Sequence, residues 1–244
     1  MSQRLCHDRT VKADRIRWLS AIVITAMMAT VFTLVIRANE LLPGERSITR
    51  WFSNLDVVFV RSFVDALDFI SSDQLAPVVF ITILPIVWWA WGRYAALTYF
   101  GTGAITALTR ITDLASRPRP TDDLQWSEVV FGLGGYPSGH VIYAVLVFGM
   151  LAYLAGFYMK PSWQRTVLRT PLVIVVITMG PARVINLDHW AMDVLGSYLI
   201  ALPFLLTAVW VHPRMPGWLA GTPRLQSLLG ADRELYTPTP NKTA

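Results

Sequence analysis

Three stretches of the sequence place arginine, histidine, serine and glycine beside long apolar segments. In the first, Arg110 and Arg117 are seven residues apart, and Pro118 follows. Seven residues are nearly two helical turns, so both guanidinium groups share one face if a helix extends this far. Such a pair binds a phosphate through parallel hydrogen bonds. The alternative is a pair of arginines that anchors a helix end at a membrane interface.

The second stretch reads Pro137-Ser138-Gly139-His140 and precedes an unbroken apolar segment. Ser138 suits the N-cap position of a helix, and Gly139 and His140 are then its first residues. The free backbone N–H groups of the first turn and the helix dipole attract an anion, and glycine lets it approach closely. The alternative is a simple helix cap followed by an interfacial histidine.

The third stretch contains Arg183, His189 and Asp193. His189 and Asp193 are four residues apart, so they share one face of a helix that begins near residue 189. A carboxylate one turn from a histidine fixes its tautomer and raises the basicity of the other ring nitrogen. Ionisable groups near membrane depth are costly and usually functional. The alternative is a buried structural His–Asp pair.

As a set, the three stretches predict phosphoryl transfer without a metal ion. Arginines bind the phosphoryl oxygens and stabilise the charge of the transition state. One histidine attacks phosphorus while the other protonates the departing oxygen. The only cysteine is Cys6, near the N-terminus, so we expect neither a disulfide nor a cysteine metal site.

The composition indicates a membrane protein. Of the 244 residues, 54% are hydrophobic and 15% are charged, whereas about 25% of the residues in a soluble domain are charged. Ten tryptophans agree with this interpretation, because tryptophan favours the lipid–water boundary. The net charge of +5 is spread over short loops, which favours anionic lipid or an anionic substrate over nucleic acid.

Six apolar segments predict an all-α fold, a bundle of six transmembrane helices. Four have 18 or 19 residues, close to the ~20 that cross a bilayer. The first has too long an apolar core and too poor a cleavage site for a secretory signal, so we interpret it as a retained anchor. The segments are Leu19–Ile36, Leu75–Gly92, Tyr94–Thr109, Val141–Met159, Thr170–Ala182 and Val194–Val211.

An amphipathic helix is predicted between the first two segments, over residues 56–72. Arg61, Asp65 and Asp68 follow one another at helical spacing, and an apolar stripe that includes Val64 and Leu67 lies opposite them. This pattern is typical of a helix that lies in the membrane interface. Packing of the stripe against the rim of the bundle is the alternative.

Lysines and arginines predict the orientation. Thirteen fall on the side of the two termini and eight on the other side, which places both termini in the cytoplasm and the three stretches at the outer face. We expect residues 1–18 to be a basic cytoplasmic tail, 19–211 the membrane domain and 212–244 a cytoplasmic C-terminal tail.

The motif spacing resembles the three-part signature of the type 2 phosphatidic acid phosphatase superfamily. The matching pattern is Arg110-x6-Arg117-Pro118, then Pro137-Ser138-Gly139-His140, then Arg183-x5-His189-x3-Asp193. Two positions depart from the family: Arg110 stands where lysine is usual, and Ala182 stands where a serine usually precedes the third-motif arginine. A guanidinium is bulkier and forked, and the missing serine removes one phosphate hydrogen bond, so efficiency and substrate fit are affected but not the reaction class.

The resemblance implies a role for each matching residue. His189 is the nucleophile that forms a phosphohistidine, Asp193 orients it, and His140 is the general acid and later the base for water. The residues implied to hold the phosphoryl oxygens are Arg110, Arg117, Ser138, Gly139 and Arg183. Family members need no metal, so neither a metal nor another cofactor is expected. Asp188 either modulates the pKa of His189 or caps the next helix, and Arg119 is solvated or tunes the substrate.

The implied function is hydrolysis of a lipid phosphate or diphosphate at the outer face of the plasma membrane. Polyprenyl diphosphate, phosphatidylglycerol phosphate, phosphatidic acid, lipid A phosphate and polyprenyl-phosphate sugar all fit. One alternative is a phosphotransferase that passes the phosphate to a lipid or sugar. Another is a non-catalytic carrier or scaffold for phospholipid headgroups, which would not require a nucleophile. Membrane lipids are the expected partners, nucleic acid is not, and the sequence does not predict an oligomeric state.

Overall fold

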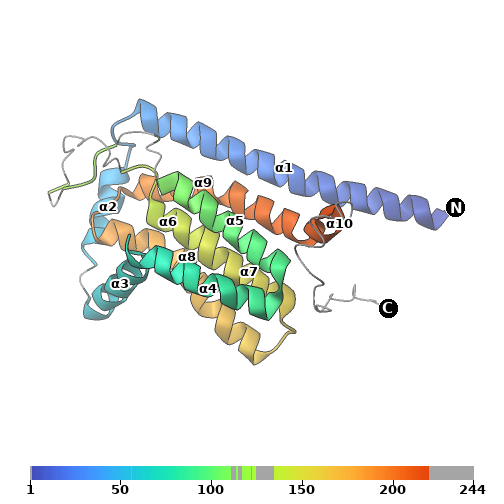
Figure 1. Ribbon diagram of the computed structural model, residues 1–244. Helices are drawn as coiled ribbons and strands as arrows, with labels where there is room; N and C mark the ends of the chain where they lie inside the picture. Colours follow the sequence, from blue (N-terminus) through green and yellow to red (C-terminus); the bar gives the residue numbers. More distant parts are fainter. Residues whose placement is uncertain are drawn as a thin grey trace.

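The computed structural model describes residues 2–55, 57–110, 114, 117–121, 123–124 and 135–219, with the side chains of residues 2–13 and 110 left out. Within these ranges the regular structure is helical, which confirms the all-α class (Figure 1). The helices are α1 (Ser2–Ala38), α2 (Glu45–Ser53), α3 (Val58–Ser71), α4 (Leu75–Trp91), α5 (Arg93–Arg110), α6 (Gly139–Tyr143), η1 (Ala144–Phe148), α7 (Gly149–Tyr158), α8 (Trp163–Ile185), α9 (Ala191–Val211), η2 (His212–Arg214) and α10 (Met215–Leu219).

The centre of the bundle is a rod formed by α6, the π-helical stretch η1 and α7. It is apolar on all sides, and its residues Val141, Leu146 and Leu154 are fully buried. A helix that is hydrophobic all round needs neighbours all round, and α5, α8 and α9 pack against this rod. The rod begins at Gly139, so the core of the fold places the second predicted stretch at one end of the bundle.

The long helix α1 lies along α9 on the outside of the bundle (Figure 1). Ala29 and Ile36 are buried against the other helices, whereas Met27 and Val31 are more than half exposed. An apolar outer face of this kind is typical of a helix that contacts lipid. The helix is continuous from Ser2, so most of the segment predicted as an N-terminal tail belongs to it.

Helices occupy all six segments that are predicted to cross the membrane. By length and composition, four described helical stretches are apolar enough to do so: Asp14–Ala38, Gly139–Tyr158, Trp163–Ile185 and Ala191–Leu219. Helices α3 and α4 pass the same test only as a pair, and they are bent by 69° at the break between them. Up to five spans are therefore supported, and the count of six stays a prediction.

The predicted amphipathic helix is present as α3. Val64 and Leu67 of its apolar stripe are buried in the main core, while Asp65 is exposed. The stripe packs against the bundle, mainly on α8 and α4, as the alternative interpretation expects. Its position in the membrane interface stays a prediction.

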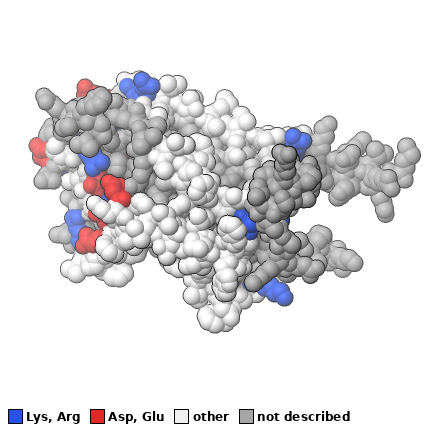
Figure 2. Space-filling model, viewed as in Figure 1, with Lys and Arg blue, Asp and Glu red and all other residues white. Residues whose placement is uncertain are grey.

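The direction of the chain gathers the predicted motifs at one end of the bundle. Helices α5 and α8 end there, and α6 and α9 begin there, at the left in Figure 1. The short helices α2 and α3 lie at the same end. On the face shown in Figure 2, charged residues collect toward the two ends of the molecule and the surface between them is uncharged. This pattern agrees with an apolar band that faces lipid.

Candidate active site

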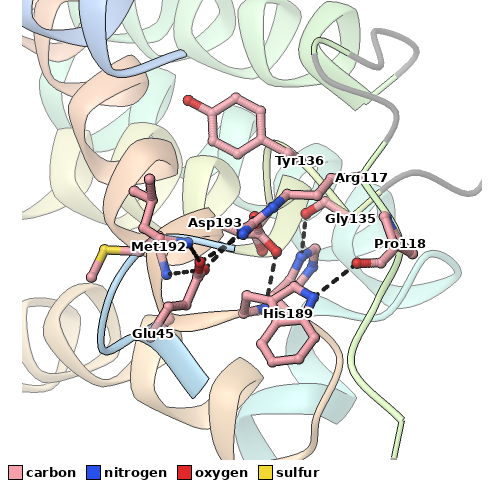
Figure 3. A network of polar contacts seen from close by, with 12 residues as sticks. Glu45, Arg117, Pro118, Gly135, Tyr136, His189, Met192 and Asp193 are labelled. Carbon is pink, nitrogen blue, oxygen red and sulfur yellow. Dashed lines mark hydrogen bonds and ion pairs between the residues drawn. The ribbon is translucent and has the colours of Figure 1, made fainter. Parts of the chain in front are cut away.

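His189 lies in the short turn between α8 and α9, and its side chain is buried. Its Nδ1 atom is 2.6 Å from the carbonyl oxygen of Gly135, as Figure 3 shows. A carbonyl only accepts hydrogen bonds, so Nδ1 carries the proton and Nε2 carries the free lone pair. That tautomer is the one a nucleophilic histidine requires.

The structure therefore corrects the predicted partner of His189. The four-residue spacing places His189 and Asp193 on one helix face, but α9 begins at Ala191 and leaves His189 outside the helix. The Asp193 carboxylate instead accepts hydrogen bonds from the backbone N–H of Trp190 and from Arg117. The Asp193 carboxylate is thus bonded to groups other than the His189 ring, and an orienting role for Asp193 stays a prediction.

Burial chiefly, and the positive charges of Arg119, His140 and Arg183 to a smaller extent, lower the pKa of His189 to about 3, against the hydrogen bond to Gly135. Because this value lies far below neutral pH, His189 carries no charge at physiological pH and its Nε2 lone pair is available. His140 and Arg183, from the second and third stretches, and Arg119, which follows the first, thus act on this imidazole through their charges.

Arg117 is buried, and each of its N–H groups faces a protein acceptor. Its Nη1 atom lies 2.8 Å from Glu45 Oε1 and 2.5 Å from Asp193 Oδ1, and its Nη2 atom lies 2.6 Å from Glu45 Oε2. The carbonyl oxygen of Glu40 accepts from Nη2 and Nε at 2.7 and 3.0 Å. An arginine has five N–H donors, so a direct contact between Arg117 and phosphate stays a prediction that this arrangement does not favour.

Glu45 joins the arginine to two helices. It is the first residue of α2, is fully buried, and also accepts hydrogen bonds from the backbone N–H groups of Leu42 and Met192. Met192 lies in the first turn of α9, where backbone N–H groups lack partners within the helix. Figure 3 shows Glu45 between the α9 backbone and Arg117. No sequence pattern points to Glu45, since one acidic residue at the start of a short helix carries no spacing signal.

Gly135 links Arg117 to His189. Its N–H donates to the carbonyl oxygen of Arg117, and its own carbonyl accepts from His189. A Cβ atom at this position would lie 3.0 Å from the Arg117 carbonyl oxygen, a tight contact, so a side chain would push this carbonyl away from Gly135. The indole N–H of Trp190 donates to Pro118 at 3.0 Å and ties the first and third stretches once more.

The second stretch forms the predicted helix start, with Ser138 at the N-cap of α6. Its backbone N–H donates to Ser197 Oγ at 2.6 Å, and Ser197 in turn donates to the Asp193 carbonyl. The Ser138 side chain makes no capping hydrogen bond, and its Oγ is buried without a partner among the described residues. It is therefore free to contact an anion. His140 follows, half-buried, in the first turn.

Arg183 is buried but only partly paired. Its Nη1 atom contacts Asp68 Oδ1 at 2.6 Å and Asp188 Oδ2 at 3.0 Å. Its Nε and Nη2 atoms are buried with no hydrogen-bond partner in the described part of the chain. Asp188 thus acts as an ion-pair partner of Arg183, a role that the sequence did not suggest. Asp68 was recognised only as part of the polar face of α3.

Arg110 and Arg119 are the remaining arginines that the sequence singled out near the site. Arg110 is the last residue of α5, and its side chain lies outside the described residues. Arg119 is exposed, and its charge acts on both His189 and Asp188.

The His189 tautomer and charge can be tested by NMR of ring-labelled histidine in detergent micelles. Because burial lowers the pKa of His189, its ring signals should stay constant between about pH 5 and pH 8, where an unperturbed histidine titrates. The His189→Asn variant assigns the signal by its loss. A titration midpoint of the His189 ring signals above about pH 6, where an ordinary histidine titrates, would contradict this lowered pKa.

The ion network predicts that Glu45→Gln destabilises the fold. Removing one partner of a buried ion pair costs about 3–5 kcal/mol, so the melting temperature in detergent should fall clearly. Glu40→Gln is the matched control, because the exposed Glu40 side chain makes the same charge change while only its carbonyl contacts Arg117. Equal melting temperatures for the two variants would contradict the role given to Glu45.

Comparisons with known proteins agree with the site. The family model of the PAP2 superfamily matches residues 88–216, more than half of the chain. The fold is similar to the crystal structure of the first transmembrane PAP2 type phosphatidylglycerolphosphate phosphatase from Bacillus subtilis, with a TM-score of 0.61 and 16% sequence identity. That match covers 84% of this chain and 98% of the other. A comparison with curated proteins found no match. With all three motifs inside the matched region, this chain belongs to the PAP2 superfamily.

Proposed function

We propose that this protein is a membrane-bound phosphatase that hydrolyses a lipid phosphate or diphosphate through a phosphohistidine. The observation that carries the proposal is a neutral, buried His189 at the same end of the bundle as three buried polar atoms, Ser138 Oγ and Arg183 Nε and Nη2, that have no partner among the described residues. A buried polar group without a hydrogen bond costs about 1–3 kcal/mol. A phosphoryl group that bonds to all three atoms offsets this cost.

In the first step, Nε2 of His189 attacks phosphorus and the bond from phosphorus to the leaving oxygen breaks. His140 gives its proton to that oxygen, so the alcohol or phosphate leaves in a neutralised form. Ser138, the first N–H groups of α6 and the free edge of Arg183 bind the equatorial oxygens and stabilise their charge.

In the second step, water attacks the phosphohistidine. His140, now neutral, takes a proton from the water, the phosphorus–nitrogen bond breaks, and inorganic phosphate leaves. Arg117 contributes by holding Asp193 and the start of α9, and thereby the turn that carries His189. Arg110 is proposed to contact the phosphate, as its motif position implies.

A lipid substrate is supported by an apolar groove beside the site. The groove has a volume of about 360 Å³ and lies between α4, α5 and the central rod, with Phe80, Ala107 and Tyr143 in its wall. Tyr143 follows His140 by one helical turn, and Ala107 precedes Arg110 by one turn, so the groove begins next to the proposed phosphate position. A lipid with its phosphate at His189 would lay an acyl or prenyl chain in this groove.

The lysine and arginine bias supports an orientation with both termini in the cytoplasm and the site at the outer face of the plasma membrane. Phosphatidylglycerol phosphate is one candidate substrate, because the similar solved structure is a phosphatidylglycerolphosphate phosphatase. Polyprenyl diphosphate and phosphatidic acid present the same phosphoryl group on an apolar chain, and a panel of purified lipid phosphates would rank them.

His189→Ala should abolish phosphate release from lipid phosphates, by roughly a thousandfold or more, because the nucleophile is lost. Release is measured in detergent with EDTA present, which also tests metal independence, and the melting temperature checks folding. Release of free phosphate indicates hydrolysis, whereas a phosphorylated acceptor indicates phosphotransfer. Turnover at the wild-type rate by this variant would refute the assignment.

Ala107→Trp should fill the groove and impair only lipid substrates. The KM for a long-chain lipid phosphate is expected to rise about tenfold, while turnover of water-soluble p-nitrophenyl phosphate stays unchanged. Leu108→Trp is the matched control, because Leu108 is exposed on the same helix but does not line the groove. Equal effects of both variants on the lipid KM would argue against this groove as the chain site.

A further inference from the structure

Arg183 is held at one end and free at the other. Two carboxylates contact its Nη1 atom, that of Asp68 at 2.6 Å and that of Asp188 at 3.0 Å. The Nε and Nη2 atoms, which form one edge of the guanidinium, have no partner among the residues that the structure describes. That edge presents two parallel N–H donors, the geometry that pairs with two oxygens of a phosphate. The carboxylates that hold Nη1 therefore determine the direction in which the Nε–Nη2 edge points.

The nearer partner comes from outside the family match. Asp68 lies on α3, 115 residues before Arg183 in the sequence, whereas the family match covers residues 88–216. The buried side chains of Val64 and Leu67, one turn before and directly beside it in the chain, fix α3 against the bundle. The Asp68 carboxylate is thus brought to Arg183 by the packing of a whole helix.

Arginine has a long side chain with several rotatable bonds, and ordering it costs conformational entropy. A carboxylate that accepts from Nη1 removes much of this freedom, because the planar guanidinium can then no longer swing or flip. Asp188 lies only five residues after Arg183, in the turn that also carries His189. Asp68 alone supplies an anchor from a separate helix.

We propose that Asp68 is a positioning residue for phosphoryl transfer: it holds Nη1 of Arg183 so that the Nε–Nη2 edge faces the phosphoryl oxygens. This inference rests on the proposed function and extends it to α3, which becomes one wall of the active site. The Asp68 side chain is 47% exposed, so solvent screens its charge and reduces its repulsion of the phosphate. Its effect is then chiefly geometric.

The test compares Asp68→Asn with Asp65→Asn, a control on the same helix whose exposed side chain lies one turn away. Loss of the charge-assisted hydrogen bond should lower kcat/KM for the lipid phosphate by about tenfold to a hundredfold. The inhibition constant of orthovanadate, which mimics the transferred phosphoryl group, should rise by a similar factor. Asp65→Asn should change neither, and Asp68→Glu should recover part of the loss.

A double-mutant cycle separates positioning from a structural role. In an Arg183→Ala background, Asp68→Asn should have no further effect on kcat/KM, because the group that it positions is gone. Additive losses, or wild-type kinetics of Asp68→Asn, would overturn the inference. If Asp68→Asn does not fold, as judged by its melting temperature, Asp68→Ser replaces it with the same expectations.

A second measurement distinguishes this inference from the proposed function. Orthovanadate should raise the melting temperature of the wild type, and this shift should shrink in Asp68→Asn but not in Asp65→Asn. A wild type that releases no phosphate from any lipid phosphate overturns the proposed function, while the vanadate shift still tests Asp68. An equal vanadate shift in all three proteins overturns the role of Asp68.

Discussion

The buried guanidinium of Arg117 is the constraint on which the rest of the site depends. A charge removed from water is very costly unless it is paired and fully hydrogen-bonded. Here the pairing comes from Glu45 at the start of α2, Asp193 in the first turn of α9, and the Glu40 carbonyl. One charged group thereby ties together three segments that the chain itself does not connect closely. Removing the carboxylate of Glu45 or Asp193 would leave this buried charge only partly paired.

The position of the nucleophile follows from this network. The Arg117 carbonyl accepts a hydrogen bond from the N–H of Gly135, and the Gly135 carbonyl accepts one from Nδ1–H of His189. The tautomer of His189 is thus set by a backbone group, and no carboxylate of the described residues bonds to the ring. The Gly135 carbonyl carries no negative charge that would favour the protonated imidazolium, and burial disfavours the charged form further. A neutral Nε2 is what attack on phosphorus requires.

The two buried motif arginines with described side chains differ in how their donors are used. All N–H groups of Arg117 face protein acceptors, which suits a residue that holds the framework. Within the described part of the chain, Arg183 has carboxylates only at Nη1 and one edge without a partner, which suits a residue that binds an anion. Both residues are arginines of the family motifs, so the number and position of the surrounding acceptors decide the difference.

The sequence by itself determined the helical class, the membrane character, the three motifs and the start of α6 at Ser138, because composition, hydropathy and local capping are short-range signals. Only the tertiary structure decided which groups meet. The contacts of His189 with Gly135, of Arg117 with Glu45 and of Arg183 with Asp68 join residues that are 54, 72 and 115 positions apart. Contacts at such separations follow from how helices pack, and no helical period in the sequence marks them.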